Sequence, residues 1–296
     1  MLKQLIWLET MEKILIVGAT GSLGMEVVKK LSEAKIPFRA LASSEESAAS
    51  LKPFTTDIWV ADARKPEALR GICDGINIVF SSLGKSVSLF KHDKGNYDEV
   101  DYEANRNIIA EAGNALVKRF VYCSIKGSDS ASELKLAEVH KKVQDLMEKA
   151  FKSYTIIKPT GFFSGLNDLL IIAKRGLLIL PGSGNYRTNS IHHSDLAQVV
   201  LDHLFEGPKK MDVGGPEIHT RDEMARIVQE KTNAKLIHVP EWTMKMGIPV
   251  LGIISKSLAH NLDYFRHVTT TDMIAPKYGS LTFKDYVASI DLNDLP

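Results

Sequence analysis

Short apolar runs alternate with helical patterns through residues 12–160 of the chain. Most of these runs lack a clean alternation of apolar and polar positions, which is typical of parallel strands covered on both faces. They predict strands at 14–17, 38–41, 58–60, 76–81, 120–123 and 154–158.

Between the runs, apolar residues recur at steps of three and four, which predicts amphipathic helices. Gly113 and Asn114 supply a helix stop. The resulting β-α-β-α series predicts an α/β fold with a right-handed, doubly wound parallel sheet of the Rossmann type. The recurring residues are Leu23, Val27, Leu31 and Ala34, then Val100, Ala104, Ile108 and Ala112, then Val139, Val143, Leu146 and Ala150.

The rhythm changes after Pro159. Loop-forming residues dominate up to residue 189, with one helical piece at 169–173, and Asp195 is expected to N-cap the next helix. A strand is predicted at 236–239, and the apolar stretch 246–258 is expected to be a buried helix or a lid. We therefore expect a Rossmann core at 11–160, completed by about 190–213. Residues 161–189 and 214–296 are expected to form a small C-terminal substrate-binding subdomain over the carboxyl edge of the sheet.

Composition is ordinary for a globular protein of 296 residues, with 44% hydrophobic and 25% charged residues. The net charge of +1 gives no global field that favours nucleic acid or anionic lipid. No apolar run is long enough for a transmembrane helix. Cys73 and Cys123 are expected to be buried, reduced thiols of a cytoplasmic protein. Residues 1–10 form an N-terminal extension that is either an extra helical turn or the result of an upstream start.

A glycine-rich turn joins the first predicted strand to a helix in the segment KILIVGATGSLGMEVVKKL. Gly18 allows the tight turn, Gly21 lets the backbone approach a pyrophosphate, and Gly24 lets the helix sit close to the strand. The free N–H groups of the helix then face the phosphates. The alternative is a tight turn with no ligand. The predicted dinucleotide contacts are Gly18, Thr20, Gly21, Ser22, Leu23 and Gly24.

The second predicted strand ends without the acid that reads the ribose of NAD. Ser43 and Ser44 stand there instead and can accept a 2′-phosphate, so NADP is favoured and NAD is the alternative. No Arg or Lys follows them, and Arg39 lies inside the strand. Glu45 and Glu46 are expected to be charges at the start of a helix.

Two later strand ends fit the same crevice. Asp62 and Ala63 follow the third strand, where a carboxylate can accept from the adenine amino group, although a surface acid or helix cap is nearly as good an explanation. Ser82, Leu83 and Gly84 follow the fourth strand, and their small size leaves room for the central part of a cofactor.

Seven segments together resemble the atypical, NmrA-like branch of the short-chain dehydrogenase/reductase superfamily. They are GATGSLG at 18, ADA at 61, SSLG at 81, VDYEANRNII at 100, FVYCSIKG at 120, YTIIKPTGFF at 154 and IHHSDLAQVV at 191. The resemblance implies a Rossmann core and a nicotinamide cofactor, with Ser124 at the position of the family's catalytic serine. It also implies that the segment from Pro159 to Phe163 passes beside the nicotinamide, through Pro159, Thr160, Gly161 and Phe162.

The chain departs from this family where a Tyr-x-x-x-Lys pair is expected. Counting forward from Ser124 puts Ala137 and Lys141 at the two positions, whereas counting backward from the next strand puts Leu136 and His140 there. Neither alignment supplies a tyrosine. His140 or Lys141 can still bind the ribose, and His140 can donate a proton, but each is as well explained as a surface residue. Ser124 either polarises a substrate carbonyl or closes the strand end.

Three functions remain open. The first is an NAD(P)H-dependent oxidoreductase that moves hydride to a small carbonyl, quinone or conjugated alkene. The second is a redox-inert NAD(P) sensor that acts through a protein partner, and the third is an assembly or scaffold protein. A homo-oligomer is possible. His192, His193 and Asp195 are not expected to bind a metal, because neighbouring side chains of an extended segment point opposite ways. The expected substrate pocket, with ordinary core as the alternative for at least half of its members, comprises Phe162, Phe163, Leu166, Trp242, Met244 and Met246.

Overall fold

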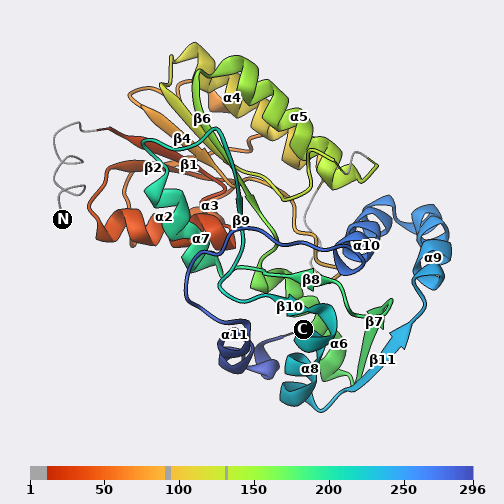
Figure 1. Ribbon diagram of the computed structural model, residues 1–296. Coiled ribbons are helices and arrows are strands. Elements are labelled where there is room, and N and C mark those ends of the chain that lie inside the picture. The colour runs from red at the N-terminus through yellow and green to blue at the C-terminus, as the bar shows by residue number, and fades with distance from the viewer. Residues whose placement is uncertain (1–11, 91–94, 131–132, 296) are drawn as a thin grey trace.

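A seven-stranded parallel sheet forms the centre of the computed structural model, which describes residues 12–90, 95–130 and 133–295. The expected extension at residues 1–10 lies outside the described residues. The strand order is β3-β2-β1-β4-β5-β6-β9, which is doubly wound as predicted (Figure 1). The strands are β1 (Ile14–Val17), β2 (Phe38–Ala42), β3 (Ile58–Val60), β4 (Ile78–Ser81), β5 (Arg119–Cys123), β6 (Ser153–Pro159) and β9 (Lys210–Val213).

Helices cover both faces of this sheet (Figure 1). On β1, Ile14 and Ile16 face the layer of α2 (Ser22–Glu33), α3 (Glu45–Ala49) and α7 (His193–Asp202). Leu15 and Val17 face the opposite layer, with α4 (Ala104–Asn114) and α5 (Lys135–Ala150). A strand sends alternate side chains to opposite faces, and because both faces are buried the apolar run is continuous.

The predicted helix at 100–112 begins with a π-helical turn, Asp98–Glu103, that leads directly into α4. Short 3-10 turns occur at Pro66–Leu69, Phe163–Leu166 and Leu292–Asp294. The π-helical turn before α4 is wider than an α-helical turn, so it displaces the side chains that follow it. Such turns often occur at functional sites. Here it carries Asp101, which is buried.

A smaller subdomain lies beside the carboxyl edge of the sheet (Figure 1). Its apolar core is centred on Phe163, Met224 and Phe283. It contains α6 (Asn167–Lys174), α8 (Arg221–Thr232) and α11 (Phe283–Ser289), with β7 (Leu177–Pro181) paired in parallel to β11 (Lys235–Val239). A short antiparallel pair, β8 (Arg187–Thr188) and β10 (His219–Thr220), lies next to it. The hairpin of α9 (Glu241–Ile254) and α10 (Lys256–Thr269) extends outward from this part of the molecule.

Helix α7 is not capped by Asp195, so that prediction was wrong. The N-cap residue is His192, whose Nδ1 accepts from the backbone N–H of Ser194 at 3.2 Å. The Asp195 carboxylate instead accepts from the backbone N–H groups of Ser280 and Leu281, at 3.0 and 2.9 Å. A distant segment, which no local pattern shows, has therefore taken the carboxylate that a cap would use.

The apolar stretch 246–258 is also not the expected buried helix. Helix α9 contains no buried residue. It packs against α10 on one side, and this contact leaves its other side exposed. Among the described residues, no helix is both long and apolar enough to cross a membrane. The two thiols, by contrast, are free and buried as predicted, and burial raises the pKa of both Cys73 and Cys123 to about 12.

Candidate functional site

The turn between β1 and α2 has the geometry that its glycines predict. Gly18 has a φ of +81°, and a Cβ placed there would lie 2.9 Å from the backbone N of Leu83. A Cβ on Gly24 would lie 2.0 Å from the carbonyl oxygen of Gly18. Both positions therefore exclude a side chain. A Cβ on Gly21 would meet the same carbonyl at 3.3 Å, a contact that a small shift relieves.

Helix α2 begins without a side-chain cap, since its N-cap residue is Gly21. Thr20, Gly21 and Ser22 are exposed, whereas Leu23 and Gly24 are buried. The helix start therefore presents backbone N–H groups and the positive end of the helix dipole to solvent. This arrangement fits a dinucleotide pyrophosphate.

The end of β4 lies against the glycine turn. A Cβ on Gly18 would lie 2.9 Å from the carbonyl carbon of Ser82, so the two segments are in contact. The Oγ of Ser82 is buried and has no hydrogen-bond partner among the described residues. Gly84 is exposed beside it. A buried hydroxyl without a partner is rare in folded proteins, and here it adjoins the predicted phosphate turn.

The end of β2 carries the two predicted serines at the surface. Ser44 is the N-cap of α3, where its Oγ accepts from the backbone N–H of Ser47 at 3.2 Å. Ser43 precedes it and is exposed. Glu45 and Glu46 lie in the first turn of α3, as predicted.

Two arginines belong to the strands next to these serines, Arg39 within β2 and Arg64 after β3. Arg39 donates to Asp57 at 2.9 Å and to the carbonyl of Ile72 at 2.6 Å, so its guanidinium is already engaged. Arg64 follows β3, which pairs with β2, and forms a bidentate ion pair with Asp62. Its guanidinium lowers the pKa of the Asp62 carboxyl. No Arg or Lys follows the two serines in sequence, and Arg64 is the cation that follows the neighbouring strand.

A buried polar cluster lies under the end of β5. Ser124 is 2% exposed, and its Oγ accepts from Nε2 of Gln144 at 2.9 Å. The same Oγ lies 3.4 Å from Nδ1 of His140. That Nδ1 is also 2.7 Å from the hydroxyl of Tyr122, and Nε2 of His140 is 3.9 Å from the Asp101 carboxylate. Strand β5, helix α5 and the π-helical turn thus bring five polar side chains together.

The electrostatics of this cluster follow from its burial. Burial lowers the pKa of His140 to about 4, because the charged imidazolium loses its hydration. Burial also raises the pKa of Tyr122 well above its usual value. At neutral pH the imidazole and the phenol are therefore both uncharged, and His140 is not a reservoir of protons.

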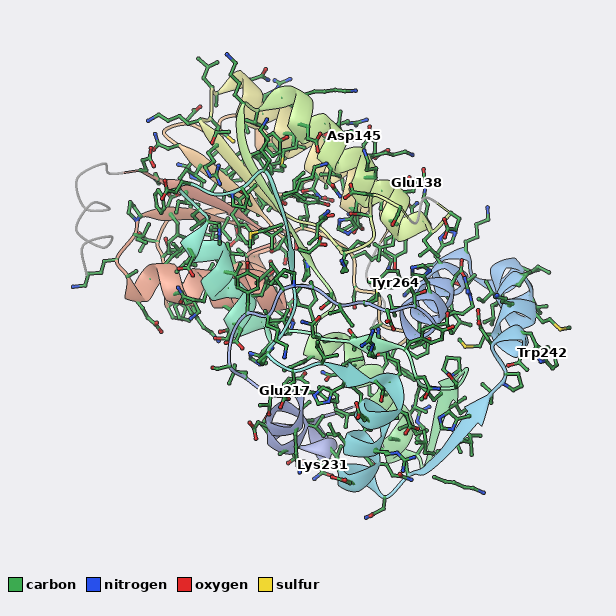
Figure 2. All side chains as sticks on the ribbon, viewed as in Figure 1. Glu138, Asp145, Glu217, Lys231, Trp242 and Tyr264 are labelled. Atoms are coloured by element: carbon green, nitrogen blue, oxygen red, sulfur yellow. The ribbon has the colours of Figure 1, made fainter. Side chains whose placement is uncertain are left out.

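Lys141 lies outside this cluster. Its side chain is 39% exposed and forms an ion pair with Asp145, one turn further along α5. Figure 2 shows Asp145 and Glu138 on the outer side of this helix. The helical phase that buries His140 turns its neighbour Lys141 away, so of the two candidate residues only His140 lies in the cluster.

The segment after β6 lies at the same edge as Ser124. Pro159 ends the strand, and its carbonyl accepts from the backbone N–H of Lys126, two residues beyond Ser124. Thr160 is buried and donates to the carbonyl of Asn189 at 2.7 Å. Gly161 has a φ of +149°, and Phe162 stacks on His193 with ring centroids 5.1 Å apart. Four neighbouring strands thus bring their predicted residues to one edge.

His193 is buried and hydrogen-bonded within the protein. Its Nε2 lies 2.8 Å from the hydroxyl of Ser164, and burial lowers its pKa to about 4. Within the described part of the chain, no group of three or more His, Cys, Asp or Glu side chains is arranged to hold a metal.

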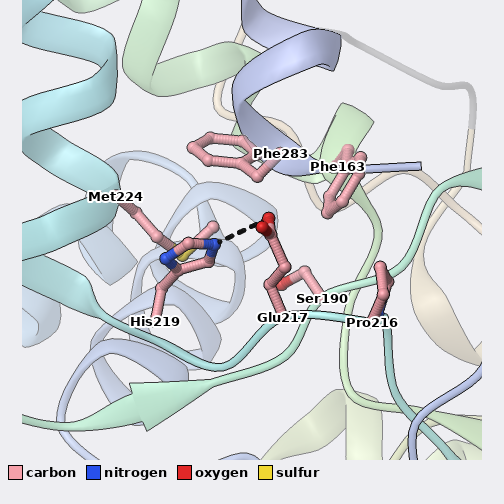
Figure 3. A pocket seen from close by; sticks show the side chains of 7 residues that line it. All are labelled: Phe163, Ser190, Pro216, Glu217, His219, Met224 and Phe283. Atoms are coloured by element: carbon pink, nitrogen blue, oxygen red, sulfur yellow. Dashed lines mark hydrogen bonds and ion pairs between the residues drawn. The ribbon is translucent and has the colours of Figure 1, made fainter. Parts of the chain in front are cut away.

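The six residues expected to line a substrate pocket do not come together. Phe163 belongs to the subdomain core and Leu166 packs against it, whereas Trp242 and Met246 are exposed on α9. Figure 3 shows a hollow beside Phe163, where His219 and Glu217 interact at 3.2 Å. The hollow has no room for a water molecule, so it cannot hold a substrate in this conformation. Its lining is Phe163, Ser190, Pro216, Glu217, His219, Met224 and Phe283.

Three members of the cluster, Tyr122, Gln144 and Asp101, were missed by the sequence argument. Gln144 follows His140 by four residues, the spacing that places two side chains on one helix face. Tyr122 precedes Ser124 by two residues, which places both on one face of a strand. Both spacings are visible in the sequence. The position of Asp101 depends on the π-helical turn, for which no local signal exists.

Comparison with known proteins adds a family and several relatives. A family model described as NAD(P)H-binding matches residues 18–207. The photosystem II assembly factor Ycf39 of Cyanophora paradoxa is 29% identical over 153 residues, which cover 52% of this chain and 46% of that protein. The chain thus spans about half the length of that relative.

Two further proteins have reductase names. The NAD(P)H azoreductase of Xenophilus azovorans is 29% identical over 195 residues, covering 64% of this chain and 63% of that protein. The crystal structure of the NADPH-dependent quinone oxidoreductase QOR2 of Escherichia coli, complexed with NADPH, superimposes with a TM-score of 0.69 at 19% identity. That superposition covers 93% of this chain and 98% of the other, and it shows a shared fold.

Proposed function

The chain belongs to the NAD(P)H-binding family, and from this premise we propose that it is an NAD(P)H-dependent reductase of small, electron-poor acceptors such as quinones. The observation that carries the proposal is the glycine turn, where Gly18 and Gly24 exclude side chains and α2 begins without a side-chain cap. The name of the azoreductase relative supports the same class of reaction.

The bound nicotinamide supplies a hydride, which is two electrons and one proton. The chain's own residues bind the cofactor and orient its nicotinamide ring. In this proposal the N–H groups around Gly21 hold the pyrophosphate, and Ser82 uses its free hydroxyl on the central part of the cofactor. Pro159, Thr160, Gly161 and Phe162 form the wall beside the reacting ring.

The second proton of the reduction comes from water in this proposal. An acceptor such as a quinone gains a hydride and then a proton, and becomes a hydroquinone. No tyrosine stands at Leu136 or Ala137 to deliver that proton, and His140, with a pKa of about 4, is uncharged at neutral pH. We assign His140 and Gln144 a positioning role, in which they fix the Ser124 hydroxyl at the end of β5.

Turnover with a panel of acceptors tests the proposal. The full-length protein is mixed with NADPH or NADH and with quinones, azo dyes, aldehydes or conjugated enones, and loss of the reduced nicotinamide absorbance is followed. We expect turnover with at least one quinone or azo acceptor and none in the Gly21→Val variant. Binding of both redox forms without turnover on any acceptor would contradict it.

A second candidate is a redox-inert NAD(P)-binding assembly factor or regulator that acts through a protein partner. It is favoured by the similarity to Ycf39 proteins and by the missing tyrosine. This candidate predicts equal affinity for the oxidised and reduced cofactor, no acceptor turnover, and a protein that co-purifies with the full-length chain.

A further inference from the structure

One side of α9 is an exposed apolar surface. Trp242, Met246, Val250, Ile253 and Ile254 are 60%, 67%, 61%, 88% and 79% exposed. We call these five residues the α9 stripe. Isolated exposed apolar residues are common, but a contiguous group of this size on one element indicates a binding surface.

The spacing of the stripe follows the helix. Trp242, Met246 and Val250 are four residues apart, and Ile253 is three residues further on, so they lie on one face. From Trp242 to Ile254 the stripe runs about 18 Å along α9. The opposite side of α9 packs on α10, and Arg266 of α10 bonds to Glu241 at the start of α9. The stripe is therefore held on a defined helix and faces away from α10.

The hairpin of α9 and α10 extends from the edge of the molecule, with α9 outermost (Figure 1). Figure 2 shows Trp242 at the periphery, far from the sheet. The stripe is thus a convex ridge. A convex apolar ridge can bury its side chains only in a broad partner surface that is soft enough to deform around it.

The charges around the stripe have one dominant sign. Lys245 is exposed on α9 at the flank of the stripe, and Lys256 is exposed just beyond the end of the helix. The two acids of the hairpin are engaged: Glu241 pairs with Lys245 and Arg266, and Asp263 pairs with Arg266. No ion-pair partner for Lys256 occurs among the described residues. The net charge of the whole chain is small, but this ridge carries an apolar surface with a free cation beside it.

We propose that the α9 stripe docks the protein on an anionic lipid surface. An apolar helix face with tryptophan and flanking lysines binds at the boundary between lipid headgroups and acyl chains. The apolar residues enter the acyl boundary, and Lys256 lies against the anionic headgroups. Helix α9 is too short to span a bilayer, so it lies on the surface. The site is separate from the dinucleotide turn and does not depend on the proposed reductase activity.

Co-sedimentation with vesicles tests this docking. The full-length protein is mixed with vesicles of phosphatidylcholine alone, or of phosphatidylcholine with phosphatidylglycerol. We expect binding to the anionic vesicles that weakens as salt rises. We expect Ile253→Glu to lower the vesicle affinity by about tenfold or more, because burial of this side chain is lost and a like charge is added. Lys256→Gln should lower it by about fivefold at low salt.

Leu116→Glu is the matched control. Leu116 is 86% exposed and follows α4, so this substitution adds the same charge at an equally exposed apolar residue outside the hairpin. It should leave vesicle affinity unchanged. The emission of Trp242 should shift to the blue on anionic vesicles, and Trp242→Phe should abolish that shift.

Three outcomes would overturn the docking proposal. The first is the absence of vesicle binding, and the second is vesicle binding that Ile253→Glu leaves unchanged. The third is a dimer, measured by sedimentation velocity, that Ile253→Glu dissociates, since a second copy would then cover the stripe. Cofactor affinity, measured on the same variants, is expected to stay unchanged in every case.

Discussion

The hydroxyl of Tyr122 lies 2.7 Å from Nδ1 of His140, in the buried layer beneath the carboxyl edge of the sheet. The other ring nitrogen of His140, Nε2, lies 3.9 Å from the carboxylate of Asp101. The favourable arrangement places the imidazole proton on Nε2, toward the acid, so that Nδ1 accepts from the phenol. Tyr122 thus holds His140 in one tautomer from outside the helix that carries it. The imidazole is therefore fixed between a phenol of β5 and a carboxylate of the π-helical turn.

Acid should destabilise the protein through His140. Its pKa of about 4 in the folded protein lies below the ordinary histidine value of 6.5, so between these two pH values the unfolded chain binds a proton that the folded chain does not bind. The stability contribution is present above pH 6.5 and is lost as the pH falls toward 4. The maximum effect is about 3 kcal/mol. Urea unfolding of the wild type and of His140→Gln, each measured between pH 7.5 and pH 4.5, shows how steeply the free energy of unfolding of each protein depends on pH. We expect a shallower dependence in His140→Gln.

His193 titrates in the same window, because burial lowers its pKa to about 4 as well. The His140→Gln variant should therefore keep part of the acid sensitivity, and a double variant with His193→Gln should lose most of it. Identical pH slopes for wild type and His140→Gln would contradict the burial argument.

Gly21→Val should remove cofactor binding and leave the fold in place. A Cβ at this position meets only the Gly18 carbonyl, at 3.3 Å, so the turn can adjust, but a branched side chain fills the space in front of the helix N-terminus. We expect the Kd for NADPH to rise by about tenfold or more, with a small change in melting temperature. Titration calorimetry and thermal unfolding measure the two effects.

Gly113→Val is the control for that substitution. Gly113 lies in α4, and nothing lies within 4 Å of a Cβ placed there. It should leave the Kd for NADPH unchanged. Equal affinity of Gly21→Val and wild type for NADPH would remove the phosphate role of this turn.

The central sheet was predictable because its local signals agree with its packing. Each predicted strand appears within one or two residues of its expected bounds, since a strand covered on both faces must be apolar throughout. Helix α9 shows the opposite case. Its apolar composition is the same kind of signal, but whether a helix is covered depends on which elements lie against it, and the sequence does not contain that information.

The candidate site divides in the same way. The glycine turn was predictable because the strand, turn and helix that build it are adjacent in the sequence. The contact between Asp101 and His140 was not, because the two residues are far apart in the sequence and an irregular turn carries the acid. Asp195 was misassigned for the same reason, since its true partners, Ser280 and Leu281, lie 85 and 86 residues away in sequence.

Arg64 should decide the preference between NADP and NAD. It follows β3, whose end lies next to that of β2, and a guanidinium matches a 2′-phosphate in charge and shape. We expect Arg64→Gln to raise the Kd for NADP by about tenfold and to leave the Kd for NAD nearly unchanged. Fluorescence titration of both cofactors measures the ratio. Lys52→Gln, at an exposed lysine beyond α3, serves as a charge-matched control, and an equal loss in both variants would contradict a specific role for Arg64.

Asp168 should hold the segment that follows β4. It is buried at the start of α6, and its two carboxylate oxygens accept from the hydroxyl of Ser88 and from the backbone N–H of Leu89, both at 2.6 Å. Asn261 of α10 donates to the carbonyl of Ser88 at 3.0 Å, so the same segment is tied to two parts of the C-terminal region. Asp168→Ala leaves the half-buried N–H of Leu89 without its acceptor and should lower the free energy of unfolding by about 1–3 kcal/mol.

The effect of that substitution should be local as well as global. Loss of the carboxylate frees the Leu89 amide, so hydrogen exchange at this amide should become faster than in the wild type. Exchange in β1 should change only as much as the free energy of global unfolding changes. Ser88→Ala removes one of the two bonds and should have a smaller effect on both measurements. If the Leu89 amide exchanges at the same rate in Asp168→Ala and wild type, the carboxylate does not hold this segment. The segment begins at Ser82, beside the glycine turn, so faster exchange accompanied by weaker NADPH binding would link the subdomain to the dinucleotide edge.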